Sequence, residues 1–303
     1  MKKLLFLLLL GLILTYTIKN KEKITRYIMI KYIDNDIKLE EKNEYYRDYD
    51  YAFVQNTTNL YPTNKQEVTN LIYTILNIGQ EEAIFYCNYK ECIDDVNQIA
   101  EDREYLSNIN NMVHPYNSYK NISFTINKYG RIKIKIKKIY SESEALLINN
   151  KIEAIEKELN IENLNDYEKI KAFHDYIINN TKYDDQVTLE NQNTNQNSNK
   201  ATGLLFENKA ICSGYSDTIA IFLNKHNFNN YRISSEEHIW NLVNIENTWK
   251  HIDATWDDPV ATDGRNILLH DFFMIDTQTL IEREGKIDTI RHNYDKNVYI
   301  EAN

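Results

Sequence analysis

The sequence predicts an α+β protein in which a helix lies against an antiparallel sheet. Apolar side chains recur at helical spacing from residue 213 onward, which indicates a helix with one buried face. Two alternating stretches rich in Trp, Val, Ile and Thr, 238–245 and 248–256, flank a two-residue turn and indicate a β-hairpin. A second hairpin, over 122–136, belongs to a smaller mixed α/β region earlier in the chain.

Length and charge bound the organisation of the chain. Its 303 residues leave room for two domains and an ample core. The net charge of −10 and the sequence pI near 5.3 argue against nucleic acid as the main partner. We expect four segments: a signal peptide or N-terminal membrane anchor at 1–18, a linker at 19–60, a small α+β domain at 61–140, and a larger domain at 141–303.

The N-terminal segment has the pattern of an export signal. Lys2 and Lys3 precede an almost unbroken apolar run over residues 4–14, and further lysines follow from Lys19 onward. No small-x-small cleavage site follows, so removal and retention as an anchor both stay open, although about 15 apolar residues is short for a membrane span. We therefore expect the rest of the chain outside the cytoplasmic membrane, either secreted or membrane-anchored at the cell envelope.

The small domain has the signals of helices and strands in turn. Thr63 and Gln66 resemble a capping box, and the helix that they open ends near Gly79. Residues 83–89 predict a strand and 91–109 a helix. The hairpin that follows carries lysines on its outward face, for which a solvated sheet face is a simpler explanation than contact with anionic wall polymer: Lys133, Lys135 and Lys137.

Two of the three cysteines lie together in this domain. Cys87 and Cys92 are separated by four residues at the predicted strand-to-helix junction. In an oxidising compartment they could form a small disulfide loop, and two reduced, unrelated thiols are the alternative. A zinc site is not expected, because the nearby sequence lacks further Cys or His ligands.

One helix should join the halves of the chain, and a second helix should follow it. Ser141 with Glu144 and Asn165 with Glu168 form capping boxes, each followed by apolar residues at helical spacing. His174 lies on the apolar face of the second helix, which favours a packed core histidine over a catalytic base.

A polar loop and an acidic segment border the central region. Residues 191–199, NQNTNQNSN, cannot bury enough apolar area to order themselves and should form a mobile loop, either a lid over Cys212 or a neutral insertion. Asp257, Asp258 and Asp263 match no calcium loop. We expect a closing strand at 268–275 and a peripheral C-terminal tail.

Cys212, the third cysteine, lies at the predicted start of the helix. Unpaired backbone N–H groups and the helix dipole lower the pKa of a thiol in this position, which favours reactive thiolate. Gly214 supports a close backbone approach here, because the chain has only 7 glycines where average usage gives about 21.

The hairpin brings a histidine and an aspartate to one face of the sheet. If Ile245 pairs with Thr248, then Trp240 lies opposite Asp253. His238 and Asp253 then become diagonal neighbours, about 7–8 Å apart between backbones and within reach of a hydrogen bond. A slip of one residue would put them on opposite faces.

An activated cysteine, a histidine base and an orienting carboxylate are the groups that thiol nucleophilic catalysis requires. Each residue alone has an ordinary explanation: an inert buried thiol, a satisfied histidine, a solvated aspartate. Their order and predicted convergence favour the catalytic interpretation of Cys212, His238 and Asp253.

Three motifs carry a family resemblance. They are ICSGYS at 211–216, HIWNLV at 238–243 and IDATWDDP at 252–259. The segment 166–259 resembles the transglutaminase-like superfamily of papain-like Cys-His-Asp thiol enzymes, whereas the first 140 residues match nothing in it. The resemblance implies a papain-like transglutaminase core, with the nucleophile helix against the sheet, as the catalytic domain at 141–303.

The resemblance also implies roles for particular residues. Cys212, His238 and Asp253 would form a catalytic triad without cofactor or metal, and Tyr183 occupies a position that similar relatives often keep near the site. Two further side chains could line the substrate site or serve only sheet packing: Trp240 and Trp256.

The implied chemistry is acyl transfer through a thioester at Cys212. Resolution by water gives a cysteine peptidase or amidase, and resolution by an amine gives a protein-crosslinking transglutaminase. The expected location favours hydrolysis of peptide or amide bonds in cell-envelope or extracellular material. The expected substrate is a peptide or protein, such as a cell-wall peptide, and the only expected membrane contact is through the N-terminal segment. A non-catalytic envelope-binding scaffold is the alternative of another class.

Overall fold

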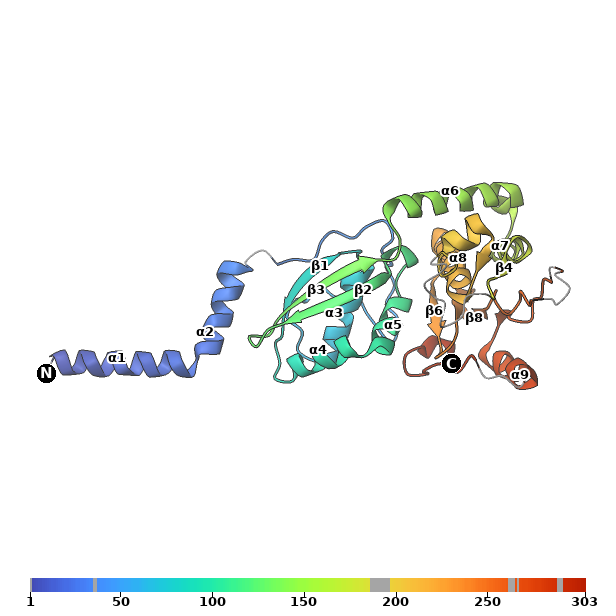
Figure 1. Cartoon of the computed structure of the whole chain (residues 1–303). Coiled ribbons are helices and arrows are strands. Elements are labelled where there is room, and N and C mark those ends of the chain that lie inside the picture. The colour runs from blue at the N-terminus through green and yellow to red at the C-terminus, as the bar shows by residue number, and fades with distance from the viewer. Residues whose placement is uncertain (1, 35–36, 186–196, 261–264, 266, 288–290) are drawn as a thin grey trace.

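The computed structural model describes residues 2–34, 37–185, 197–260, 265, 267–287 and 291–303 (Figure 1). The chain begins with α1 (Lys2–Lys19), α2 (Lys21–Ile28) and the short η1 (Met29–Ile33), which project from the rest of the molecule. Leucine side chains of α1 such as Leu12 lie exposed. Within the described ranges, no helix combines the length and apolarity needed to cross a membrane.

The segment expected to be a linker is built into the molecule. Beyond η1, its described part has no helix or strand, but Tyr51 and Val54 are fully buried. Arg47 donates hydrogen bonds to the carbonyl oxygens of Met112 (3.0 Å) and Asn230 (2.7 Å). Its guanidinium therefore connects the N-terminal half to Asn230, the first residue of a strand in the C-terminal half.

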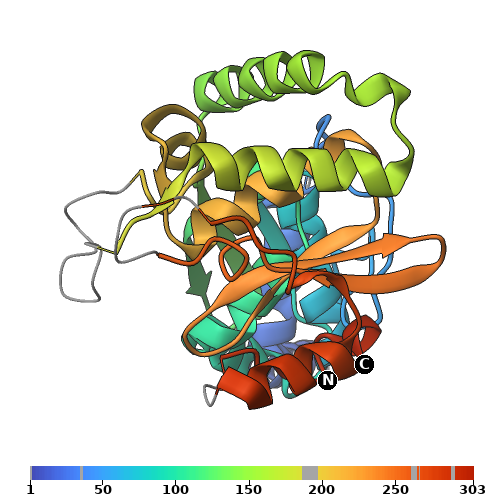
Figure 2. The same ribbon diagram turned by 90° about the vertical axis from the view of Figure 1, so that its right-hand side faces the viewer.

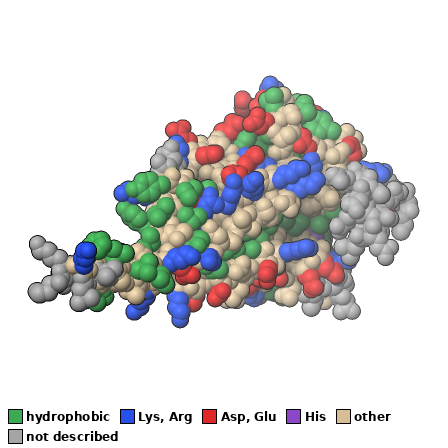
Figure 3. Space-filling model, turned by 60° about the vertical axis from the view of Figure 1, so that its left-hand side comes forward, with side chains coloured by type: hydrophobic (Ala, Val, Ile, Leu, Met, Phe, Trp, Pro, Cys, Tyr) green, Lys and Arg blue, Asp and Glu red, His purple; other side chains and the backbone are tan. Residues whose placement is uncertain are grey.

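The N-terminal half packs three helices against a three-stranded antiparallel sheet of order β1-β3-β2. Its elements are α3 (Lys65–Asn77), β1 (Glu82–Tyr86), α4 (Cys92–Glu101), α5 (Arg103–Asn111), the short η2 (Pro115–Asn117), β2 (Tyr119–Ile126) and β3 (Arg131–Lys138). The isoleucines of β3 face the core, whereas Lys133 and Lys135 face outward and form ion pairs with Glu82. Figure 3 shows basic and acidic side chains interspersed over one face of the molecule.

Three local predictions in this half can be compared with the structure. Cys87 and Cys92 are joined by a disulfide. The first helix is capped by Asn64, which accepts the N–H of Glu67, and not by Thr63. The single helix predicted over 91–109 is wrong: Asp102 interrupts it in an extended conformation and caps α5 by accepting the N–H of Tyr105 at 2.9 Å.

The second half places helices on both sides of a four-stranded antiparallel sheet of order β6-β7-β8-β9 (Figure 2). The helices are α6 (Glu142–Leu159), η3 (Ile161–Asn163), α7 (Asp166–Asn180), η4 (Gly203–Glu207), α8 (Cys212–Lys225), α9 (Thr277–Ile287) and η5 (Ile300–Ala302). The strands are β4 (Lys182–Tyr183), β5 (Lys209–Ala210), β6 (Asn230–Ser234), β7 (Ile239–Ile245), β8 (Thr248–Ile252) and β9 (Phe273–Ile275). The capping boxes predicted at Ser141 and Asn165 are both present.

The four-stranded sheet has a buried face on each side. Leu242 and Trp240 pack into a core that continues into the N-terminal half, whereas Val243 packs with α6, α7 and α8. Because successive strand residues point to opposite faces, one strand serves both cores. The C-terminal tail joins the first core through the fully buried Tyr299, so the expectation that it is peripheral is wrong.

Candidate active site

Cys212 is the first residue of α8 and its thiol is free and partly exposed. The preceding residue, Ile211, is extended and donates its N–H to the carbonyl of Ser198 at 2.9 Å. A Cβ at Gly214 would lie 2.7 Å from the same carbonyl oxygen and 2.9 Å from the Cβ of Ala210. The close backbone approach predicted at this glycine is therefore confirmed, and it fixes where the helix starts.

Most of the polar loop predicted over 191–199 lies outside the described residues. Its last part, 197–199, is described and forms a turn in which Ser198 is fully buried. This turn packs against the start of α8 through the Ser198 carbonyl, so this part supports the helix and does not form a mobile end.

Tyr183 reaches the site through a short parallel ladder. β4 pairs with β5 so that Tyr183 lies beside Ala210, two residues before the cysteine. Burial raises the pKa of the Tyr183 phenol, and the neighbouring Cys212 adds to that shift. The phenol is thus protonated at neutral pH and lies near the sulfur.

The strand register brings His238 and Asp253 together. β7 and β8 pair as predicted, with Ile245 opposite Thr248. His238 Nε2 lies 2.5 Å from Asp253 Oδ2, and both side chains are buried. The ring also lies beside Cys212, whose thiol raises the pKa of the imidazole, and Nδ1 is the ring nitrogen that does not contact Asp253.

One detail of the predicted hairpin is wrong. The β7–β8 ladder ends at Asn241 and Ile252, so Trp240 and Asp253 are not a cross-strand pair. Residues 254–257 instead form a turn, because Asp253 Oδ1 accepts the N–H groups of Thr255 (3.0 Å) and Trp256 (3.2 Å). One oxygen of the carboxylate thus stabilises the turn that follows it, while the other oxygen contacts His238.

The ionisation of the pair follows from its contacts. Burial by itself would raise the pKa of the Asp253 carboxyl, but His238 and His292 hold it well below its ordinary value. Burial likewise opposes a charge on His238, but the carboxylate and the adjacent Cys212 raise the pKa of its imidazole above the ordinary value. The site is therefore built for an imidazolium between a carboxylate and a sulfur.

His292 is a member of the site that the sequence interpretation missed. Its Nε2 lies 2.8 Å from Asp253 Oδ2, the same oxygen that His238 contacts. The residue follows α9 in a stretch without helix or strand, where periodicity carries no signal. Only its residue type, in a chain with 7 histidines, could have suggested it.

The two tryptophans differ in their surroundings. Trp240 is 1% exposed, stacks on His238 with centroids 5.7 Å apart, and donates its indole N–H to His251 Nδ1 at 3.0 Å. Because Trp240 is buried, its side chain is not accessible to a substrate. It packs against one face of the His238 imidazole. Trp256 is partly buried against His292 with centroids 4.7 Å apart. A substrate contact of Trp256 stays a prediction.

The described acidic residues near Pro259 form buried hydrogen bonds within the protein. Asp257 Oδ1 accepts the N–H of Phe272 at 2.9 Å, and Asp258 accepts the hydroxyl of Tyr215 at 2.5 Å. Burial raises the pKa of Asp258 to about 6. Asp263 lies outside the described residues.

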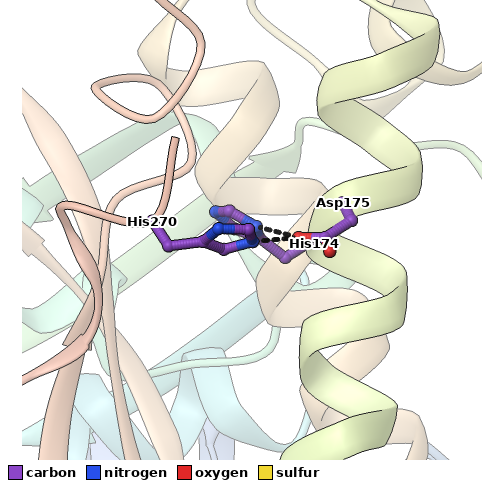
Figure 4. Close-up of side chains that lie close together, drawn as sticks. All are labelled: His174, Asp175 and His270. Carbon is purple, nitrogen blue, oxygen red and sulfur yellow. Dashed lines mark hydrogen bonds and ion pairs between the residues drawn. The ribbon is translucent and has the colours of Figure 1, made fainter. Parts of the chain in front are cut away.

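Two groups of histidine and aspartate have the ligand atoms to hold a metal among the described residues. One is His238, Asp253 and His292, in which both histidines already hydrogen-bond one Asp253 oxygen; the other is His174, Asp175 and His270 (Figure 4). The second group already contains a cation, because Lys171 Nζ lies 2.5 Å from an Asp175 oxygen and 3.0 Å from His270 Nε2.

His174 itself is fully buried, as predicted for a core histidine. Its Nδ1 lies 3.1 Å from Asp175 and its Nε2 3.2 Å from Asp257. Burial opposes a positive charge, but these carboxylates raise the pKa of His174. Its contacts thus link α7 to the turn after Asp253, behind the site.

Comparison with known proteins gives a limited picture. No family model matches the sequence, and no curated protein matches it. Four solved chains match in structure. One is a TGase that is 19% identical, with a TM-score of 0.33 over 46% of this chain and 44% of that chain. Another is a putative cysteine protease from Cytophaga hutchinsonii that is 13% identical, with a TM-score of 0.28 over 49% of this chain and 65% of that chain.

This chain therefore spans less than two thirds of the length of either structure. The resemblance to transglutaminase-like thiol enzymes rests on the three sequence motifs.

Proposed function

We propose that this protein is a thiol enzyme that transfers acyl groups through a thioester at Cys212, and that its reaction is hydrolysis of peptide or amide bonds. One observation carries the proposal: the buried His238 ring hydrogen-bonds the Asp253 carboxylate and lies beside the free thiol of Cys212. A thiol, a base and an orienting carboxylate in this order are sufficient for nucleophilic acyl transfer.

The proposed reaction moves one proton through His238. His238 Nδ1 takes the thiol proton, and the thiolate sulfur attacks the acyl carbon to give a tetrahedral oxyanion. As the C–N bond breaks, the imidazolium returns that proton to the leaving amine and a thioester remains. Water then attacks the thioester while His238 takes its proton, and the C–S bond breaks to release the carboxylic acid and the thiol.

Two groups are the proposed donors to the oxyanion. The backbone N–H of Cys212 is at a helix start, where N–H groups have no partner within the helix. The protonated phenol of Tyr183 is the nearby side-chain donor. Tyr183, which the family resemblance places near the site, would then be the side-chain donor of the oxyanion hole.

The substrate is proposed to be a peptide or protein of the cell envelope or the extracellular space. The Cys87–Cys92 disulfide supports this location, because such bonds persist in oxidising compartments. The exposed apolar side chains of α1 and the lysines beside them support an export segment or membrane contact.

The test uses iodoacetamide and dye-labelled casein. Alkylation of Cys212 should already proceed at acidic pH, because the thiolate is the nucleophile and His238 favours it, and this early phase should be lost in His238→Ala. Peptide fragments from casein support the hydrolase. Incorporation of a fluorescent primary amine in place of cleavage would make the protein a crosslinking transglutaminase. A thiol with one ordinary transition and no turnover would leave a binding scaffold.

A further inference from the structure

We propose that His292 is a positioning residue of this site, which shares the Asp253 carboxylate with His238 and thereby sets how strongly the catalytic imidazole holds its proton. The inference rests on the proposed thiol chemistry and adds a fourth side chain to it.

The hydrogen bonds of Asp253 show how the carboxylate is shared. Oδ1 accepts two backbone N–H groups of the following turn. Oδ2 accepts from His238 Nε2 at 2.5 Å and from His292 Nε2 at 2.8 Å. Each oxygen thus has two donors, which is the full complement of a carboxylate. The two imidazole rings therefore share one carboxylate oxygen, Oδ2.

The surroundings of His292 hold its ring in place. The side chain is fully buried and stacks on Phe272 with centroids 5.5 Å apart and an interplanar angle of 15°. The indole of Trp240 meets it edge-on at 4.6 Å. Glu284 Oε1 accepts the backbone N–H of His292 at 2.7 Å and lies 3.0 Å from its Nδ1. A carboxylate on α9 thus holds the backbone of the residue whose ring contacts Asp253.

Packing of the C-terminal tail holds His292 in the site. Tyr294 donates to the Ala302 carbonyl at 2.9 Å, and Tyr299 hydrogen-bonds Asn108 in the N-terminal half at 2.8 Å. Both tyrosines belong to the first core. The site is therefore complete only when the tail is packed, and the N-terminal half contributes to that packing.

The sharing has a consequence with a definite sign. Removing the second donor leaves the charge on Oδ2 to His238 alone, so the imidazolium holds its proton more tightly. It should persist to higher pH and should protonate the leaving amine less readily. A purely structural residue would lower stability without moving this transition. The titratable groups around the two rings are Cys212, Tyr183, Asp253, His251, Glu284 and Arg291.

Three variants of the full chain test the proposal. His292→Phe keeps a flat ring without a donor, and His292→Gln keeps an N–H donor at a similar reach. His226→Gln is the matched control, because that histidine pairs with Glu156 at the far end of α8. Each is alkylated with iodoacetamide from pH 4 to 10, with thermal melting and casein cleavage measured alongside.

In the wild type we expect two transitions: thiolate formation beside the imidazolium, and loss of the imidazolium proton. His292→Phe should move the second transition up by about half a pH unit or more. It should also slow casein turnover about tenfold while alkylation at neutral pH changes little. His292→Gln should restore most of both, and His226→Gln should match the wild type.

Unchanged transitions in His292→Phe, or equal losses in the Phe and Gln variants, would overturn the role of His292 and leave the thiol chemistry standing. A wild type with one ordinary thiol transition would overturn the proposed function and this inference together. If His292→Phe does not fold, His292→Asn, whose donor is too short to reach Oδ2, takes its place against His292→Gln under the same criteria.

Discussion

Asp253→Asn removes the charge from the centre of the site and keeps its shape. The amide oxygen can still accept the N–H groups of Thr255 and Trp256, so the turn should persist. The amide NH₂ then stands where Oδ2 stood and faces the N–H groups of His238 and His292. Donors face donors there, so His238 must change its tautomer and can no longer accept the thiol proton at Nδ1.

The size of the effect follows from these contacts. In a serine-protease triad the equivalent exchange lowers kcat by about 10⁴ through the wrong tautomer, and we expect a loss of about 10³–10⁴ here. Unfolding free energy should fall by about 3 kcal/mol at pH 7, as when one partner of a buried pair is removed.

The pH dependence has a definite sign. Because the pKa of Asp253 is lowered, its contribution to stability is fully present above the unfolded carboxyl pKa of about 3.9 and is lost as pH falls through the folded value. In Asp253→Asn the charge that raises the pKa of His238 is gone while burial, which lowers it, remains. The imidazolium transition should therefore move to lower pH, opposite to the shift expected for His292→Phe.

The assay is iodoacetamide alkylation against pH together with casein cleavage, and Asp258→Asn is the control. Asp258 is also buried and lies five residues further along the chain, but its partner is the hydroxyl of Tyr215. The control should keep near-normal turnover. The reasoning is refuted if Asp253→Asn retains a tenth of the wild-type rate, or if its imidazolium transition moves upward.

Three further predictions concern stability. Replacing Cys87 and Cys92 together by serine should lower unfolding free energy by about 2 kcal/mol, because the bridge closes a short loop, and alkylation of Cys212 should not change; a changed alkylation profile would contradict the separation of the disulfide from the site. Gly214→Ala should lower the unfolding free energy by about 1–3 kcal/mol and slow alkylation, because its Cβ would lie 2.7 Å from a carbonyl oxygen. The control, Gly285→Ala, has nothing within 4 Å and should leave the melting temperature unchanged or raise it. Equal effects of the two variants would count against the close approach at Gly214. Burial raises the pKa of Asp258 to about 6, so between about pH 4 and 6 the folded protein binds a proton that the unfolded chain has lost, and stability falls as pH rises through that window. In denaturant titrations, Asp258→Asn should therefore raise the unfolding free energy by about 1–2 kcal/mol at pH 7 and change it little at pH 4. An equal change at both pH values would refute the assignment.

The sequence by itself determined the features that local physics controls. Apolar spacing after Cys212 predicts the helix, because a buried stripe requires that period. The register of Ile245 and Thr248 follows from a two-residue turn, and Glu246 and Asn247 indeed adopt the positive φ values of 49° and 61° that such turns need. His238 and Asp253 lie directly beyond the ends of β7 and β8, so this register brings them near each other, and the turn after Asp253 completes the contact.

Only the tertiary structure decided what reaches the site from elsewhere. His292 lies 39 residues from the carboxylate that it contacts, and it arrives because a tail of buried tyrosines packs against the sheet and the N-terminal half. Periodicity tells which face of an element is buried but not which partner buries it. Contacts of this kind depend on how the complete core fits together, so the fourth member of the site had no signature in the chain.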